Sequence, residues 1–295
     1  MNATQLTPAA LWPRTLAVTR HALETGALQP IATEARLVPM ANTTFQVRVL
    51  GRVALKERKR PAPSNAEPFN PFANPEPDLV LGDVPPSHVC LLNKFNVVEH
   101  HLLLVTRAFE SQDALLTHAD FDALSTCLEG LDGLAFYNAG ETAGASQRHK
   151  HLQLVPPLGP DSLRAPVESL LPPLPGPGRV IAAESLPFAH LLAGLGPWGA
   201  PGQGARMLAA YRLLREAMGL GEHAPYNLLV TRDWMLLVPR SRAEHLGVNV
   251  NALGFAGSLL VRTPEQYDAV AALGPLELLR QVAGIESPAV IPEKK

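Results

Sequence analysis

The sequence predicts an α+β protein with two related halves, and three observations support this fold class. Short apolar runs typical of strands alternate with longer amphipathic segments typical of helices along the chain. A proline-rich stretch at residues 156–179 interrupts this pattern near the middle of the 295 residues. The run HHLLLVTR at residues 100–107 resembles YNLLVTR at residues 226–232, and such an echo indicates a duplicated unit.

The first half begins with a predicted amphipathic helix at residues 8–25, where apolar side chains recur at near-helical spacing at Leu11, Leu16, Val18 and Leu23. A second helix is predicted at residues 117–131, with Thr117 as its N-cap and Asp120 in its first turn. The runs that predict strands are residues 43–55, 88–95, 101–106, 134–138 and 149–155. Residues 57–78 are charged and then rich in proline and asparagine, so we expect a long loop that is weakly ordered without ligand.

The second half carries an amphipathic helix at residues 206–218 and a hairpin formed by residues 227–231 and 234–239. A last long helix is expected to start at Thr263, with Pro264 in its first position and Gln266 completing a capping box. We therefore divide the chain into an N-terminal half (1–160), a proline-rich connector (161–186) and a C-terminal half (187–295).

Composition and charge exclude several classes of protein. The 25 basic and 27 acidic residues give a formal net charge of −2, so the basic surface of a nucleic-acid-binding protein is not expected. No run approaches the roughly 20 apolar residues of a membrane span, and the first residues lack the pattern of a signal peptide. Cys90 and Cys127 lie in apolar runs and are expected to be buried, reduced thiols. We expect a cytoplasmic protein without membrane or nucleic-acid partners; the sequence does not indicate its oligomeric state.

The segment NAGETAGASQRHKHLQLV, residues 138–155, carries the most informative residues. In a strand, alternation places His149, His151 and Gln153 on one face and Leu152 and Leu154 on the other, towards the core. Lys150 shares the core-facing side and is expected to lie near its edge or to extend towards solvent. The residues that precede the strand are small or polar, so their backbone amides can approach phosphate oxygens: Gly144, Ala145, Ser146 and Gln147.

Two kinds of chemistry fit an H-x-H pattern on a strand. Two imidazoles can bind a metal ion, and the tripeptide alone leaves this alternative open. A neutral imidazole is also a good nucleophile towards phosphorus at neutral pH. For that role the attacking nitrogen of His151 must be unprotonated, so the other nitrogen is expected to donate to a carbonyl group.

Together with four further phrases, this segment resembles the ATP adenylyltransferase (diadenosine tetraphosphate phosphorylase) family, in the transferase branch of the histidine-triad superfamily. The phrases are LLNKFNVV (91–98), HLLLVTRAFESQ (101–112), YNLLVTRDWMLLVPR (226–240) and NALGFAGSLLVR (251–262). The resemblance implies a histidine-triad-like α+β fold, an antiparallel sheet with helices, built as two such halves in one chain, with the C-terminal half completing the nucleotide site.

The resemblance also implies an activity, the reversible phosphorolysis of diadenosine tetraphosphate to ATP and ADP. His151 would attack the α-phosphorus, and phosphate would discharge the adenylyl-histidine to ADP. The alternatives are a related nucleotidyltransferase or a hydrolase that acts on other nucleoside polyphosphates or on sugar nucleotides. A non-catalytic nucleotide sensor is a further alternative, although a sensor does not need the nucleophile.

The resemblance assigns roles to individual residues. His149 would orient the phosphate or stabilise the leaving group, and Gln153 would hold the transferred phosphoryl group. Contacts to substrate would come from Lys56, Asn93, Lys94, Asn138, Gly144, Ala145, Ser146, Gln147, Asn251, Ser258 and Arg262. Mg²⁺ would enter with the nucleotide, bound by phosphates and water, without a metal site built from protein ligands. The sequence departs from the family at Arg148, where an acidic residue is common, and at Glu99-His100-His101, where a proline is missing. We expect His100 and His101 to be structural or exposed.

Overall fold

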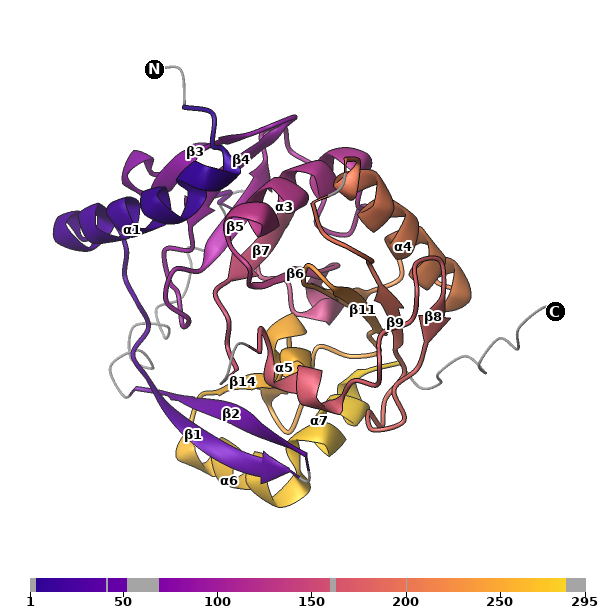
Figure 1. Ribbon diagram of the computed structural model, residues 1–295. Helices are drawn as coiled ribbons and strands as arrows, with labels where there is room; N and C mark the ends of the chain where they lie inside the picture. Colours follow the sequence, from indigo (N-terminus) through magenta and orange to yellow (C-terminus); the bar gives the residue numbers. More distant parts are fainter. Residues whose placement is uncertain (1–3, 41, 52–68, 160–162, 200, 285–295) are drawn as a thin grey trace.

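The computed structural model describes residues 4–40, 42–51, 69–159, 163–199 and 201–284, and it confirms an α+β fold around a large antiparallel sheet (Figure 1). Helices α1 (Pro8–Thr25), α3 (His118–Gly130) and α4 (Gln203–Ala217) pack together on one face of this sheet. A smaller sheet and helices α5 (Ala252–Ala256), α6 (Pro264–Leu273) and α7 (Pro275–Val282) lie on the opposite side. None of the described helices combines the length and the apolar character needed to cross a membrane.

The large sheet runs without a break through both halves of the chain. Its nine strands are, in spatial order, β3 (Val80–Val84), β4 (His88–Leu92), β5 (Leu102–Thr106), β7 (His151–Val155), β6 (Leu134–Asn138), β10 (Tyr226–Val230), β11 (Trp234–Pro239), β9 (Leu191–Gly194) and β8 (Val180–Ile181). Each strand is antiparallel to its neighbours. The halves join where β6 pairs with β10 and Asn138 lies opposite Asn227.

The order of elements repeats in the two halves. Strand β5, helix α3 and strands β6 and β7 follow one another in the first half, as β9, α4, β10 and β11 do in the second. The spatial order repeats as well, because β7 lies between β5 and β6 just as β11 lies between β9 and β10. The predicted two-halved fold is confirmed, but the echo between residues 100–107 and 226–232 matched the wrong strands. The counterpart of β5 is β9, and the counterpart of β10 is β6.

The smaller sheet pairs an early segment of the chain with a late one. Strands β1 (Thr33–Met40) and β2 (Thr43–Leu50) form an antiparallel hairpin, and β14 (Ser258–Val261) adds to β2 in parallel. The remaining short elements are η1 (Pro77–Leu79), η2 (Glu141–Ala143), η3 (Pro166–Leu170), β12 (Glu244–His245) and β13 (Val248–Asn249).

Strand β1 was not predicted, and residues 52–55 of the predicted strand 43–55 lie outside the described residues. Elements η3 and β8 fall within the connector 161–186; the division of the chain stays a prediction.

The predicted helices form, with some differences in detail. Helix α1 has the predicted bounds, but its buried face consists of Leu11, Thr15, Val18 and Ala22. Leu16 and Leu23 are 40% and 51% exposed, so two of the four predicted core positions were wrong. Thr117 caps α3 and Asp120 lies in its first turn, as predicted, and the two residues also form a capping box. At α6, Thr263 accepts a hydrogen bond from the Gln266 amide, but the Gln266 side chain accepts from the amide of Arg262.

Lys150 is completely buried, which contradicts the expected position near an edge or towards solvent. Its ammonium group lies 2.5 Å from Glu110 Oε2 and 3.4 Å from Asp120 Oδ2, and it donates to the carbonyl of Leu115. Burial acts to raise the pKa of Asp120, but hydrogen bonding to His88 and the charge on Lys150 outweigh it and lower that pKa below its ordinary value. The two carboxylates therefore make a buried lysine tolerable beneath the strand that carries His151.

We predict that Lys150→Met lowers the free energy of unfolding by about 3–5 kcal/mol, because it leaves the buried carboxylate of Asp120 without the positive charge of Lys150. Chemical denaturation at neutral pH measures this difference. The matched control is Lys94→Met, since Lys94 pairs with Glu76 at the surface and should lose less than about 1 kcal/mol. Equal stability of the Lys150 variant and the parent protein would contradict the prediction.

Candidate active site

A cavity of about 930 Å³ lies on the face of the large sheet opposite α1, α3 and α4, and both halves of the chain line it. Its floor carries side chains from neighbouring strands, namely Leu91, Leu103, His151 and Gln153. Segments between residues 243 and 266 form another part of its wall. Its volume falls within the range of about 300–1,000 Å³ that is typical of small-molecule sites.

Most of the residues predicted for the site line this one cavity. They are Asn93, Lys94, Asn138, Gly144, Ala145, Ser146, Gln147, His151, Gln153, Asn251, Ser258 and Arg262. His149 does not line it, and Lys56 lies outside the described residues. Segments up to 170 residues apart in sequence are therefore brought together around His151 and Gln153.

His151 is held in the tautomer that a nucleophile needs. Its Nδ1–H donates to the carbonyl oxygen of His149 at 2.8 Å, so its Nε2 carries the free lone pair. Burial lowers the pKa of His151 to about 4, although the bond to the His149 carbonyl acts in the opposite direction. The backbone amide of His151 donates to Gln112 Oε1 at 2.8 Å, which fixes the start of β7. The neutral ring with its unprotonated Nε2 is therefore the dominant form at neutral pH.

His149 lies just before β7 and is covered by other side chains. Its Nε2–H donates to the carbonyl of Thr106 at 2.8 Å, and its Nδ1 lies 3.1 Å from Asn70 Nδ2. The rings of Phe72 and Phe109 pack against it, with centroids 5.9 and 5.3 Å away. Both ring nitrogens of His149 are therefore occupied, and its contact to His151 is made by its backbone carbonyl.

Gln153 is connected to a histidine that was expected only to be structural or exposed. His101 is 6% exposed and lines the cavity, and its Nε2 lies 2.9 Å from Gln153 Oε1. Its other ring nitrogen lies 3.2 Å from Asn93 Nδ2. His100 faces elsewhere, with its Nδ1 3.1 Å from the hydroxyl of Thr19.

Part of the predicted loop contributes to the site. Residues 57–68 lie outside the described residues, but Asn70 and Phe72 pack onto the two histidines. The ring of Phe72 is 5.2 Å from that of His151, and Asn70 donates to His149. Asn70 and Phe72 thus have partners that are remote in sequence, while weak order of the loop without ligand stays a prediction.

The loop before β7 passes close to the C-terminal half at Gly144. This residue has φ of +88°, and a Cβ atom there would lie 2.7 Å from the carbonyl oxygen of Val250. The amides of Gly144 and Ala145 are hydrogen-bonded within the turn, to Glu141 and Gly140. The amides of Ser146 and Gln147 make no hydrogen bond to a described residue. Only these last two of the four predicted amides are thus free to bind an anion.

A buried network anchors this loop. Asn138 Oδ1 accepts from Asn227 Nδ2 and from the amide of Ala252, each within 2.9 Å. Arg240, which is 4% exposed, donates to Asn227 Oδ1 and to the carbonyls of Ala143 and Val250. Burial lowers the pKa of Arg240 to about 10, which leaves the guanidinium charged at neutral pH.

Three cations from the described part of the chain line the cavity: Lys94, Arg48 and Arg262. Lys94 pairs with Glu76 at 2.5 Å, so its charge is already partly compensated. Arg48 of β2, which was not predicted, has no ion-pair partner among the described residues. Its only hydrogen bond to a described residue is a 3.4 Å contact to Gln46, and its buried Nε has no partner among those residues. An anion is the natural partner for such a guanidinium.

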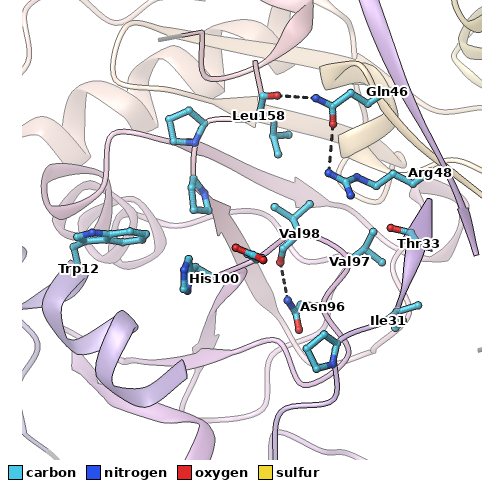
Figure 2. Close-up of a pocket in the computed structure, with 14 residues that line it drawn as sticks. Trp12, Ile31, Thr33, Gln46, Arg48, Asn96, Val97, Val98, His100 and Leu158 are labelled. Carbon is cyan, nitrogen blue, oxygen red and sulfur yellow. Dashed lines mark hydrogen bonds between the residues drawn. The ribbon is translucent and has the colours of Figure 1, made fainter. Parts of the chain in front are cut away.

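A second cavity of about 540 Å³ shares Arg48, Val97 and Val98 with the first (Figure 2). Figure 2 shows Trp12 and His100 on one side of it and Arg48 with Gln46 on the other. It contains none of the predicted catalytic residues. Within the described part of the chain, no group of three or more His, Cys, Asp or Glu side chains that could hold a metal ion is found in either cavity or elsewhere.

Family models match almost the whole chain. The Ap4A phosphorylase N-terminal domain matches residues 1–173, and the ATP adenylyltransferase C-terminal domain matches residues 184–284. Diadenosine tetraphosphate phosphorylase 2 of Saccharomyces cerevisiae is 32% identical in a match that covers 78% of this chain and 80% of the yeast protein. Protein APA1 of the same yeast is 26% identical, with 85% and 86% covered.

The fold is also similar to solved structures. The crystal structure of the yeast Ap4A phosphorylase Apa2 matches with a TM-score of 0.79 and 27% identity, over 96% of this chain and 100% of that one. The same enzyme in complex with Ap4A matches with a TM-score of 0.78 at the same identity and coverage.

We predict that His151 stays neutral, with its proton on Nδ1, down to about pH 4, because burial opposes the charged ring. Protonation at Nε2 below that pH removes the lone pair, so nucleophilic reactivity is lost as the pH falls through this value. Nitrogen NMR spectra of histidine-labelled protein report the tautomer and its titration. A His151 signal that titrates near the ordinary value of 6.5 would contradict the prediction.

Proposed function

The chain belongs to the Ap4A phosphorylase family, and from this premise we propose that it cleaves diadenosine tetraphosphate (Ap4A) with inorganic phosphate to give ATP and ADP. The observation that carries the proposal is the neutral His151, whose Nε2 lone pair is free at a cavity lined by both halves. A double displacement through this nucleophile divides one difficult step into two easier ones.

The first step forms a bond between His151 Nε2 and the α-phosphorus of Ap4A. The bond from this phosphorus to the bridging oxygen breaks, and ATP leaves with the electron pair on its terminal phosphate. In the second step an oxygen of inorganic phosphate attacks the same phosphorus and breaks the N–P bond. ADP is released, and His151 regains its lone pair. The Nδ1–H bond to the His149 carbonyl can stabilise the positive charge that the ring gains in the adenylylated state.

The surrounding residues are proposed to bind the phosphates. The amides of Ser146 and Gln147 and the carboxamide of Gln153 supply neutral donors beside His151. Lys94 and Arg48 supply charge at the wall, and Lys56 is proposed as a further phosphate contact. Asn138 Oδ1 is already occupied, so only its NH₂ group remains for substrate. Asn251, Ser258 and Arg262 belong to the wall proposed to hold the second nucleotide.

Mg²⁺ is proposed to enter with the polyphosphate. Among the described lining residues the carboxylates are Glu76, which is paired with Lys94, and the exposed Glu141. These two groups fit a metal ion held mainly by phosphate oxygens and water. The free, buried thiols of Cys90 and Cys127 agree with the reducing cytoplasm that we propose as its location.

We predict that His151→Ala lowers the rate of Ap4A phosphorolysis by at least about 10³-fold, the scale expected when a covalent nucleophile is lost. The products are separated and counted with and without phosphate. ATP and ADP that form only with phosphate support phosphorolysis, whereas ATP and AMP without phosphate would indicate a hydrolase.

The matched control for this variant is His190→Ala. His190 is buried and its Nδ1–H donates to the carbonyl of Phe188, two residues earlier, in the same way as His151 donates to His149. It does not line the cavity, so its loss should cost stability without abolishing turnover. Retention of most activity in the His151 variant would overturn the mechanism.

We further predict that adenylate is trapped on His151 and not on Lys150 when the enzyme is mixed with labelled Ap4A without phosphate. Lys150 lies beneath the strand with its ammonium group between Glu110 and Asp120, so it cannot reach the cavity. Quenching in base, digestion and mass spectrometry locate the label. Label on His151 that phosphate discharges to ADP supports both steps and excludes a binding-only sensor; label on Lys150 would refute the assignment.

A further inference from the structure

We propose that His101 is a positioning residue: it fixes the carboxamide of Gln153 so that the NH₂ group, and not the oxygen, is presented to the phosphoryl group at His151. This proposal rests on the proposed function of the cavity. The two ends of a carboxamide have nearly the same shape but opposite roles, because the NH₂ group donates and the oxygen repels a phosphate oxygen. The orientation of the Gln153 carboxamide therefore decides whether this side chain attracts or repels the phosphoryl group.

A chain of hydrogen bonds starts at a donor whose role cannot change. The backbone amide of Phe95 lies 3.3 Å from Asn93 Oδ1, and a backbone amide only donates. Asn93 must therefore turn its NH₂ group towards His101 Nδ1, 3.2 Å away. His101 Nδ1 then accepts, so its proton is on Nε2 and is donated to Gln153 Oε1 at 2.9 Å.

The orientation of Gln153 follows from this chain. Its oxygen is taken by His101, and its NH₂ group makes no hydrogen bond to a described residue although the side chain lines the cavity. Burial lowers the pKa of His101 to about 4, although the bond to Gln153 acts in the opposite direction. A neutral ring is what the chain requires, because a charged one would point an Nδ1–H at the Asn93 NH₂ group.

The second half contains a natural comparison. His190 precedes β9 as His101 precedes β5, and β9 is the counterpart of β5. His190 is also buried, but its Nε2 accepts from the amide of Ala183 and its Nδ1–H donates to a carbonyl, so both of its bonds are to backbone. The corresponding strand β11 carries apolar residues, Trp234, Leu236 and Val238, in the core that it forms with α5 and α7. Of these two histidines, only His101 is therefore hydrogen-bonded to a polar side chain of the cavity, Gln153.

The test is a double-mutant cycle for Ap4A phosphorolysis. His101→Phe should lower kcat about 10- to 100-fold with a smaller effect on KM, because a donor to the phosphoryl group matters most in the transition state. Gln153→Ala should lower kcat at least as much. The double variant should be no slower than Gln153→Ala, since His101 acts only through Gln153. His190→Phe, the matched control, should leave kcat unchanged although it also removes a buried imidazole.

Two outcomes would overturn the proposal. If the effects of His101→Phe and Gln153→Ala multiply in the double variant, His101 supports the fold and not Gln153. The second is a nitrogen NMR signal of His101 with its proton on Nδ1 at neutral pH, since the chain requires Nε2–H, the reverse of His151. The NMR result does not depend on turnover, so it separates failure of this proposal from failure of the enzyme to use Ap4A.

Discussion

The pairing of β6 with β10, which joins the two halves of the chain, is the constraint on which the rest of the structure depends. Asn138 and Asn227 lie opposite each other at its end, and Arg240 is held there by neutral oxygens alone among the described residues. Three of these oxygens are the backbone carbonyls of Ala143 in the loop before β7, Val250 just before α5, and Val282 at the end of α7. A buried guanidinium is costly unless its donors are satisfied, so these segments are tied to one geometry. The loop that faces His151 is thus positioned by the junction of the halves.

The face of the large sheet opposite α1, α3 and α4 is packed differently in the two halves of the chain. In the C-terminal half, Trp234, Leu236 and Val238 of β11 are buried in a core with α5 and α7. In the N-terminal half, the equivalent face of β7 carries His151 and Gln153, and the small core around Val89 and Leu103 leaves room above it. On this face, the C-terminal half therefore forms an apolar core, and its residues 243–266 contribute to the wall of the cavity around His151. Among the described residues, the cavity around His151 has no equivalent above β11, because β7 carries His151 and Gln153 where β11 carries apolar side chains.

The sequence predicts local features well and remote partners poorly. Helix α1 and the cap of α3 depend on residues within a few positions, and they formed as predicted. Lys150 was misjudged, and the contacts of His101 and Phe72 were not predicted, because the partners Glu110, Gln153 and His151 lie 40 or more residues away along the chain. Strand β1 was missed because most of its side chains are partly or fully exposed, so it lacks the apolar signal of a strand and depends on pairing with β2. Alternation placed His151 and Gln153 correctly but failed for His149, which lies before the strand begins.

Because His151 and His101 are buried and neutral, neither ring supplies positive charge to the cavity. A protonated His151 would attract a polyphosphate more strongly, but it would have no lone pair with which to attack. Because burial lowers the pKa values of His151 and His101 to about 4, both rings are neutral, and the charge that binds phosphate must come from elsewhere. Arg48, Lys94 and Arg262 lie at the wall of the cavity, while the groups beside the nucleophile are neutral donors. In the proposed mechanism, these cations hold the substrate at a distance, while the proposed nucleophile keeps the protonation state that the reaction requires.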